Sequence, residues 1–312
     1  MKFPVFDLHC DTASKLMLTA DNPVELLENS LHIDIKRGQL LDGYAQCFAC
    51  FTTTEEHQNP MMDFERQLIS ILSEITKNNN LIRQAFTAKD IEKNNADGVI
   101  SAILTLEGTA GIGHDPALLE DLYKIGFRIS TLGWNEKNPL TGSQATGGGL
   151  TDQGAEYVKE AQRLGMLIDV SHISDEGFWD IMDITTGPIV ATHSNSRAVC
   201  NVNRNLTDEM FVEICRTDGV AGINLYADFL GKQPDLDTVC DHIFHFLSLD
   251  PSGTHIALGG DLDGCSNLAA GFQSVADYPK LVTKLRERGL DEQSIQNIFW
   301  NNAIGVMKKC CI

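Results

Sequence analysis

Histidine and carboxylate residues recur in this 312-residue sequence at the ends of short apolar runs. Residues 7–11 read Asp-Leu-His-Cys-Asp, so His9 and Asp11 stand two positions apart. An extended chain turns side chains two positions apart to the same face. Imidazole and carboxylate groups are ligands that suit Zn²⁺ and related divalent ions. The pair therefore indicates a metal site at the end of the first apolar run.

Four further apolar runs end in the same kinds of residue, namely Glu107, His172, His193 and Asp261. Together with the first pair, this is more than one tetrahedral ion needs. The set suits two ions that share one carboxylate, with Glu107 as the natural bridge. Two ions about 3.5–4 Å apart can hold a hydroxide between them and polarise a carbonyl. Asp261 would then pass a proton from the nucleophile to the leaving amine.

Each of these residues also has a plainer interpretation. A single histidine at a strand end is usually a hydrogen-bonded structural residue. Taken alone, residues 261–264 (Asp-Leu-Asp-Gly) could form a turn with side-chain-to-backbone hydrogen bonds, and Glu107-Gly108 could lead into a helix. Their joint occurrence at corresponding positions of five runs favours the metal site.

The elements that must position these residues are apolar, β-branched runs separated by helical patterns. We expect strands at residues 3–8, 44–51, 100–106, 127–132, 166–170, 188–192, 220–225 and 255–258. Regular alternation of strand and helix is typical of a parallel sheet with crossover helices. Eight such units predict one (β/α)₈ barrel over residues 1–312, in which catalytic groups sit at the carboxyl ends of the strands.

An open, doubly wound sheet is the alternative fold. It needs a glycine-rich phosphate-binding turn after the first strand, where this sequence has His9-Cys10-Asp11-Thr12. Residues 147–149 are three glycines, but they lack the lysine and the strand-turn-helix context of a phosphate loop. We expect a flexible loop there.

The composition excludes several classes of partner. The chain has 24 Lys+Arg and 43 Asp+Glu residues, giving a net charge of −19, which disfavours nucleic acids and anionic membranes. No apolar run reaches the roughly 18 residues of a membrane span. Residues 1–8 lack the features of an export signal. Nine scattered cysteines are an odd number and indicate reduced thiols in a cytoplasmic protein.

Other cysteines and histidines with suggestive spacing are expected to be structural. Cys240, His242 and His245 fall on one predicted helix that should point away from the barrel interior. Cys47 and Cys50 have a redox-like spacing, but they lie inside a predicted strand and are expected to be inert buried thiols.

These motifs resemble those of the membrane (renal) dipeptidase family, the M19 metallopeptidases, within the metal-dependent amidohydrolase superfamily. The resemblance runs from residues 6–12 to the closing helices near Asn301-Asn302, and it includes residues 149–152, 165–172, 192–194 and 259–264. The first strand carries His-x-Asp, whereas most amidohydrolases have His-x-His there. This difference favours a dipeptidase over a deaminase or a phosphotriesterase.

The resemblance implies a metal centre with two Zn²⁺ ions. His9 and Asp11 would bind one ion, His172 and His193 the other, and Glu107 would bridge them.

The resemblance also implies roles in substrate binding. Asp261 matches the acid/base aspartate, which can also hold the free amino group of the substrate, and Asp263 would support it. Arg204 matches an arginine that pairs with the terminal carboxylate, a group that a guanidinium fork can meet at two points. Tyr226 matches a tyrosine that lines the substrate pocket.

One position departs from the family pattern. Vertebrate members end the fourth strand in a histidine that contacts the substrate carbonyl, whereas this sequence has Trp134 there. Tryptophan cannot exchange a proton at neutral pH, but its indole N–H can donate one hydrogen bond. We expect Trp134 to line the pocket or to donate to the oxyanion.

The expected function is the zinc-dependent hydrolysis of a small dipeptide, and the resemblance suggests a homodimer. Two alternatives stay open. One is another amidohydrolase, acting on N-acyl amino acids or lactams. The other is a metal-binding barrel that serves as a scaffold without catalysis. Asp261 weighs against the scaffold, because binding alone requires no proton shuttle.

Overall fold

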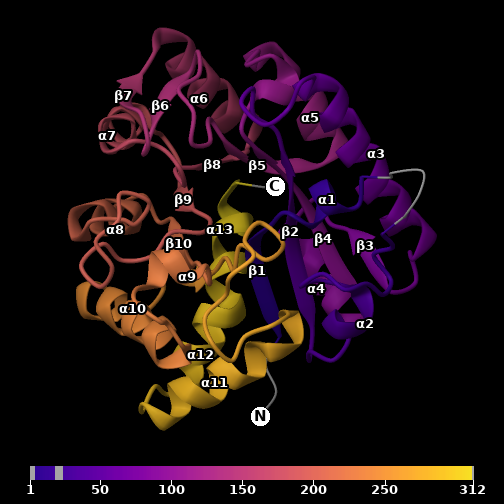
Figure 1. Cartoon of the computed structure of the whole chain (residues 1–312), viewed down its shortest axis with the longest axis vertical. Helices are drawn as coiled ribbons and strands as arrows, with labels where there is room; N and C mark the ends of the chain where they lie inside the picture. The colour runs from indigo at the N-terminus through magenta and orange to yellow at the C-terminus, as the bar shows by residue number, and fades with distance from the viewer. Residues whose placement is uncertain (1–3, 18–23, 311–312) are drawn as a thin grey trace.

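Parallel strands close into a barrel surrounded by helices in the computed structural model, which describes residues 4–17 and 24–310 (Figure 1). The barrel strands are β1 (Val5–Cys10), β2 (Tyr44–Phe51), β4 (Ile100–Glu107), β5 (Phe127–Thr131), β8 (Leu167–Asp169), β9 (Ile189–Ala191), β10 (Val220–Ile223) and β11 (Ile256–Leu258). Their order is β2-β1-β11-β10-β9-β8-β5-β4, and pairing of β2 with β4 closes the ring. The prediction of a (β/α)₈ barrel is therefore confirmed.

Each of the eight predicted runs overlaps one barrel strand, and most ends of the runs differ from the ends of the strands by one or two residues. The first run was predicted to end at Leu8 but continues to Cys10, while its first residue, Phe3, lies outside the described residues. The run at 220–225 stops at Ile223, because the backbone N–H of Asn224 donates to the side chain of Asn195.

Three strands were not predicted. β3 (Ile82–Gln84) is a short, partly polar strand that pairs with the first half of β4. β6 (Thr141–Ser143) and β7 (Gly147–Leu150) form an antiparallel hairpin outside the barrel. The expectation of a flexible loop at residues 147–149 was therefore wrong. The reason is close backbone packing, since a Cβ on Gly142 would lie 2.0 Å from the carbonyl oxygen of Gly147.

Helices fill the connections between the strands. They are α1 (Thr12–Lys15), α2 (Ile35–Gly38), α3 (Pro60–Lys77), α4 (Ala88–Ala96), α5 (Leu119–Ile125), α6 (Asp152–Leu164), α7 (Asp175–Ile184), α8 (Asp208–Arg216), α9 (Ala227–Leu230), α10 (Leu236–Leu249), α11 (Tyr278–Glu287), α12 (Glu292–Gln296) and α13 (Asn302–Cys310). Most of the longer ones are amphipathic; α3, for example, buries Phe64, Ile71 and Ile75 on its barrel side.

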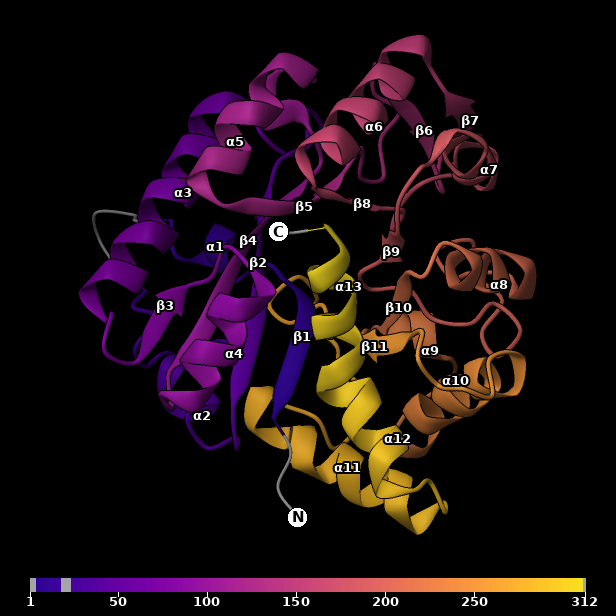
Figure 2. The same ribbon diagram turned by 180° about the vertical axis from the view of Figure 1, so that it is seen from behind.

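Helix α13 covers one end of the barrel (Figure 2). Its first residue, Asn302, donates to the carbonyl oxygens of Gly253 and Ile256, at the amino end of β11. Ile304 and Met307 pack with Phe6 of β1 in the apolar core. The amino end of the barrel is thus closed, and the carboxyl ends of the strands are left to build a site.

The described part of the chain contains no helix long and apolar enough to cross a lipid bilayer.

Candidate active site

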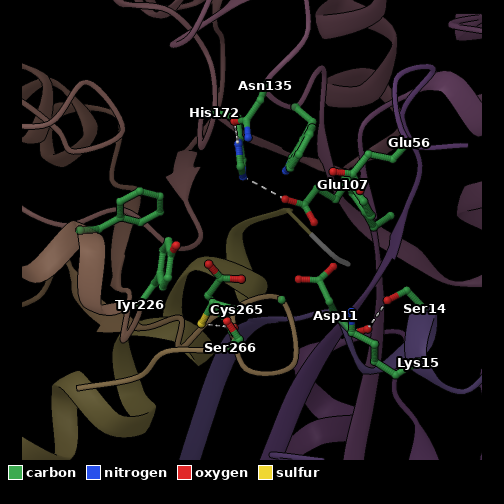
Figure 3. Close-up of a pocket in the computed structure, with 15 residues that line it drawn as sticks. Asp11, Ser14, Lys15, Glu56, Glu107, Asn135, His172, Tyr226, Cys265 and Ser266 are labelled. Atoms are coloured by element: carbon green, nitrogen blue, oxygen red, sulfur yellow. Dashed lines mark hydrogen bonds and ion pairs between the residues drawn. The ribbon is translucent and has the colours of Figure 1, made fainter. Parts of the chain in front are cut away.

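The carboxyl ends of four strands bring the five expected metal ligands together. These ligands are His9, Asp11, Glu107, His172 and His193, and all five are buried. In each of two groups, Glu107 with His172 and His193, and Glu107 with His9 and Asp11, the potential ligand atoms lie within 4.8 Å of one another. Figure 3 shows Asp11, Glu107 and His172 facing one pocket.

Glu107, the last residue of β4, divides its two carboxylate oxygens between these groups. Oε2 lies 3.3 Å from Nε2 of His9, and Oε1 lies 3.0 Å from Nε2 of His172 and 3.6 Å from Nε2 of His193. Burial raises the pKa of Glu107 to about 8; His9 opposes this rise and the nearby charge of Asp11 adds to it. This is the geometry expected of a carboxylate that joins two cations.

Hydrogen bonds fix the ring of His193 with Nε2 free of a proton. The Thr192 hydroxyl donates to Oδ2 of Asp169 over 2.6 Å, so it must accept the proton on Nδ1 of His193, 2.7 Å away. Nε2 is then the nitrogen with a free electron pair. A second partner of this kind orients metal-binding histidines in proteins.

His172 is oriented in a comparable way. Its Nδ1 lies 2.9 Å from Oδ1 of Asn135, an acceptor that also receives a bond from Gln144. Nε2 of His172 is therefore unprotonated and lies 3.0 Å from Nε2 of His193. Burial lowers the pKa of both histidines, and the charges of Arg204 and His9 lower it further. Two bare nitrogens this close suit a shared cation.

The first ligand pair contains unsatisfied buried atoms. Within residues 4–17 and 24–310, Nε2 of His9 and Oδ1 of Asp11 are shielded from solvent and have no hydrogen-bond partner. Such atoms are costly unless a cation or a donor completes them. Burial lowers the pKa of His9, but Glu107 and Asp11 outweigh it and hold that pKa well above its usual value. The donor set and these unpaired atoms fit divalent metal ions.

Two buried aspartates join these strand ends through hydrogen bonds. Neither of them was given a role in the sequence analysis. Oδ1 of Asp7 accepts from the backbone N–H groups of His9 and Gly260, and its Oδ2 accepts from the hydroxyl of Tyr278. Asp7 thereby joins the end of β1, which carries His9, to the loop after β11.

Asp169 repeats this arrangement on the other side of the barrel. Its Oδ1 accepts from the backbone N–H groups of Ser171 and Thr192, which precede the two expected histidine ligands His172 and His193. Its Oδ2 accepts from the hydroxyls of Thr131 and Thr192. The signal available in the sequence was an aspartate inside an apolar run, two or three residues before a ligand.

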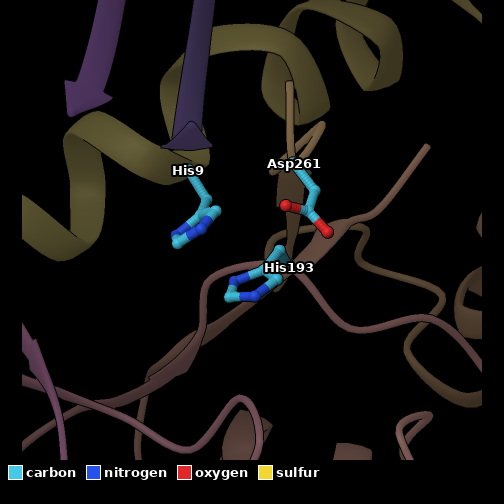
Figure 4. A group of neighbouring side chains, drawn as sticks. All are labelled: His9, His193 and Asp261. Carbon is cyan, nitrogen blue, oxygen red and sulfur yellow. The ribbon is translucent and has the colours of Figure 1, made fainter. Parts of the chain in front are cut away.

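Asp261 lies in the loop after β11 and completes a third group with His9 and His193 (Figure 4). Its backbone has a positive φ of 56°, and its Oδ2 accepts a 3.1 Å hydrogen bond from Asn224. Burial raises the pKa of Asp261 to about 6, although His9 opposes the rise. A carboxyl group poised near neutrality can both accept and donate a proton.

Asp263 supports the same loop. One carboxylate oxygen accepts from the hydroxyl of Thr12 over 2.6 Å, and the other accepts from the backbone N–H of His32 over 2.6 Å. These contacts join the loop after β11 to the segment that follows β1, where Asp11 lies.

Arg204 is buried close to the histidine ligands. Its Nη1 donates to the Ser194 hydroxyl over 2.8 Å, while Nε and Nη2 are shielded and have no hydrogen-bond partner in the described part of the chain. With His172 it borders a narrow crevice beside the pocket that Asp11, Glu107 and His172 face. A buried guanidinium with two donor atoms available can bind an anion such as a carboxylate.

The pocket lined by Asp11, Glu107 and His172, called the main pocket because it contains the expected ligands, has a volume of about 360 Å³. Trp134 lines it, with its ring centroid 6.0 Å from that of His172, and Tyr226 stands opposite Glu107 (Figure 3). The Tyr226 hydroxyl donates to Asp228 over 2.8 Å. Lys15 and Glu56 also border the pocket.

The histidines that were expected to be structural have ordinary hydrogen-bond partners. His242 accepts from the backbone N–H of Ser196 and faces the carbonyl oxygen of Leu230, so both ring nitrogens are occupied. Cys50 is buried in β2, and burial raises its pKa to about 12. Neither residue contributes to the site.

A closed barrel with buried histidines and carboxylates at the carboxyl ends of its strands is the arrangement expected of a barrel enzyme that uses divalent metal ions. The sequence model of one family, described as "Membrane dipeptidase (Peptidase family M19)", matches residues 1–311. The chain therefore belongs to the M19 membrane dipeptidase family of metallopeptidases.

Individual relatives agree with this assignment. The chain is 34% identical over 216 residues to an uncharacterized dipeptidase of Schizosaccharomyces pombe, a match that covers 67% of this chain and 53% of that protein. It is 26% identical over 300 residues to dipeptidase tcpJ of Claviceps purpurea, covering 89% of this chain and 69% of that protein.

Solved structures of similar proteins superpose over nearly the whole chain. A metallopeptidase from Rhodobacter sphaeroides, crystallised with a phosphinate mimic of the dipeptide L-Ala-D-Ala, gives a TM-score of 0.90 at 25% identity, covering 99% of this chain and 100% of that one. Dipeptidase AC, a metallopeptidase of family M19, gives a TM-score of 0.92 at 25% identity and covers 99% of both chains.

Proposed function

We propose that this protein is a dipeptidase whose centre holds two zinc ions. The observation that carries the proposal is the division of the Glu107 oxygens between the His9–Asp11 group and the His172–His193 group. The phosphinate dipeptide mimic bound by the Rhodobacter sphaeroides relative supports a dipeptide as the substrate.

The bound ions would supply an activated hydroxide and would polarise the peptide carbonyl. The residues of this chain would hold the ions, transfer the proton and bind the substrate. His9 and Asp11 hold one position, His172 and His193 hold the other, and Glu107 belongs to both. The hydrogen bond from Thr192 to Asp169 keeps the free electron pair of His193 on the side of the site.

Asp261 is the proposed acid and base. Its place beside His9 and His193 puts it next to both proposed ion positions. We propose that Asp261 takes the proton of the attacking nucleophile and gives it to the nitrogen of the scissile bond. The hydrogen bond from Asn224 holds its carboxylate toward this position.

Arg204 is proposed to bind the terminal carboxylate of the dipeptide, since Nε and Nη2 are buried donors without partners. Asp261, which lines the pocket, would also receive the free amino group. Recognition of both charged ends restricts the substrate to two residues. Trp134 and Tyr226 would line the pocket around the side chains.

Two further assignments stay proposals. No disulfide joins the cysteines within the described residues, which supports a cytoplasmic protein. The family resemblance supports a homodimer of a single barrel unit spanning residues 1–312.

Metal analysis combined with a substrate panel tests the proposed function. We expect two zinc ions per chain, turnover of free dipeptides, and no turnover of the same dipeptides acetylated at the amino end or amidated at the carboxyl end. In the His193→Ala variant, both metal content and activity should fall. Hydrolysis of N-acyl amino acids or lactams in preference to dipeptides would favour the other amidohydrolase. Absence of any amide hydrolysis by the zinc-loaded protein would favour the scaffold.

A further inference from the structure

A separate group of ligand-type side chains lies at the amino end of the barrel, opposite the active site. Cys215 stands near the end of α8, Asp250 caps the end of α10, and His255 directly precedes β11. One potential ligand atom from each residue lies within 4.8 Å of those from the other two. Asp261, by contrast, follows the carboxyl end of β11, so the strand separates the two groups.

Asp250 contains an unsatisfied oxygen. Its Oδ1 accepts from the hydroxyl and the backbone N–H of Ser252, while Oδ2 is shielded from solvent and has no hydrogen-bond partner among the residues that the structure describes. The thiol of Cys215 therefore does not satisfy Oδ2, although the two groups are close. A shielded carboxylate oxygen without a donor is costly, and a cation would remove that cost.

His255 has the orientation of a metal ligand. Its Nδ1 lies 2.8 Å from the carbonyl oxygen of Gly219, so Nδ1 carries the proton and Nε2 has the free electron pair. A hydrogen bond from one ring nitrogen to a carbonyl is the usual support of a metal-bound histidine.

Cys215 is a free, half-buried thiol. Burial raises its pKa to about 12, and the charge of Asp250 adds to the rise. The group is therefore protonated when no cation is near, and a metal ion would displace the proton to form a thiolate.

We propose that Cys215, Asp250 and His255 bind a divalent metal ion, with Zn²⁺ the best match, at a site distinct from the active site. Sulfur, nitrogen and carboxylate donors suit zinc, whereas Mg²⁺ and Ca²⁺ prefer oxygen ligands alone. Three protein ligands leave one tetrahedral position for water. The ion would link the ends of α8 and α10, which lie side by side, to the start of β11 (Figure 1).

The position of this site points to a structural effect. In barrels of this type, chemistry takes place at the carboxyl ends of the strands, and residues at the amino end serve stability. A metal that binds only the folded chain stabilises it in proportion to its affinity. Loss of the ion should therefore lower the melting temperature and leave the hydrolysis of dipeptides in place.

Cobalt substitution tests the proposal with a signal that the active site does not produce. None of the proposed active-site ligands is a cysteine, so a thiolate-to-cobalt charge-transfer band in the near ultraviolet would report on Cys215. We expect this band when the full-length apoprotein is titrated with Co²⁺, and we expect zinc to abolish it. Cys215→Ser and His255→Gln should both lack the band, and each should bind one equivalent of metal fewer than the wild type.

Cys265→Ser is the matched control, because Cys265 is the thiol that borders the main pocket. Retention of the band in this variant, together with its loss in Cys215→Ser, assigns the band to the proposed site. Absence of the band in the wild type, or its persistence in Cys215→Ser, would overturn the proposal. Dipeptidase activity measured on the same samples reports on the proposed function separately, since Cys215→Ser leaves the active-site ligands unchanged.

Discussion

The side-chain amide of Asn224 donates a hydrogen bond to Oδ2 of Asp261 over 3.1 Å. The same amide group donates to the backbone carbonyl oxygen of His193. The side-chain oxygen Oδ1 of Asn224 accepts from the backbone N–H of Tyr226. Asn224 directly follows β10, so one residue joins the proposed acid/base, a metal ligand and a pocket residue.

Replacement of Asn224 by alanine should therefore impair proton transfer more than substrate binding. We expect kcat to fall about 10-fold or more, within the roughly 10²–10⁴-fold that general acid–base catalysis contributes, with a smaller change in KM. The lost donor favours the ionised carboxylate, so its removal raises the pKa of Asp261 and moves the acidic limb of the kcat/KM profile to higher pH. Asn80→Ala, at an exposed position, serves as the control. An unshifted pH profile would show that Asn224 is merely structural.

Gly264 has a steric role at the active site. A Cβ at this position would lie 2.2 Å from Oδ2 of Asp11 and 2.3 Å from Oδ1 of Asp261. Both contacts are below the distance that atoms tolerate, so Gly264→Ala must displace one or both carboxylates. We expect metal content and kcat/KM to fall together.

The matched control is Gly305→Ala in α13, where a Cβ would meet nothing within 4 Å. Alanine is favoured over glycine in a helix by roughly 1 kcal/mol, so this variant should be as stable as the wild type or more so. Equal activity of the two alanine variants, measured at saturating zinc, would contradict the steric role of Gly264.

The barrel could be predicted because its signals are local. Apolar, β-branched runs recur at regular intervals, and each expected ligand directly follows or ends such a run. The residues whose side chains join the strand ends by hydrogen bonds could not be predicted in this way. Asp7 bonds to Gly260 and Asn224 bonds to Asp261, so these contacts join distant parts of the chain. Only the folded barrel brings these partners together.

The hairpin of β6 and β7 eluded prediction for a different reason. Glycine has no side chain to contribute to an apolar or alternating pattern, and three successive glycines favour a loop. In the folded chain, the same absence of side chains lets Gly142 approach the carbonyl oxygens of Gly147 and Gly148. The close approach that makes these glycines fit a strand pair is therefore invisible in the hydrophobic pattern.

Thr192 should control metal affinity without touching the metal. Its hydroxyl accepts from Nδ1 of His193 and donates to Asp169. Thr192→Val keeps the shape but removes the hydroxyl, so the ring of His193 loses its support and Asp169 loses a donor. We expect zinc affinity to fall by about 10–100-fold, as for other outer partners of metal ligands.

Thr192→Ser retains the hydroxyl and should bind zinc nearly as the wild type does. Competition with a chromophoric chelator measures both affinities. Wild-type affinity in Thr192→Val would refute the role of this hydroxyl in orienting His193.

The metal-free protein should lose stability as the pH rises from about 6.5 to about 8. Burial raises the pKa of Glu107 from 4.5 to about 8, so between these values the folded chain holds a proton that the unfolded chain has released. Stability therefore decreases with rising pH over this window. Asp261 acts in the same direction between 3.8 and about 6. His9 also does so, because its pKa is raised on folding and its stabilising charge is lost as the pH rises. His172 and His193 act in the opposite direction, since their lowered pKa makes stability rise with pH up to about 6.5, and the net decrease is therefore expected above that pH.

Melting temperatures of the chelated protein, recorded between about pH 5 and pH 8, measure this effect. Glu107→Gln mimics the protonated carboxyl, so the melting temperature of this variant should depend less on pH than that of the wild type. Zinc competes with the same protons, and its stabilising effect on the wild type should grow as the pH rises. A melting temperature of the chelated wild type that increases from about pH 6.5 to about pH 8 would mean that Glu107 is ionised without a cation, and that the buried carboxylate does not require the proposed metal pair.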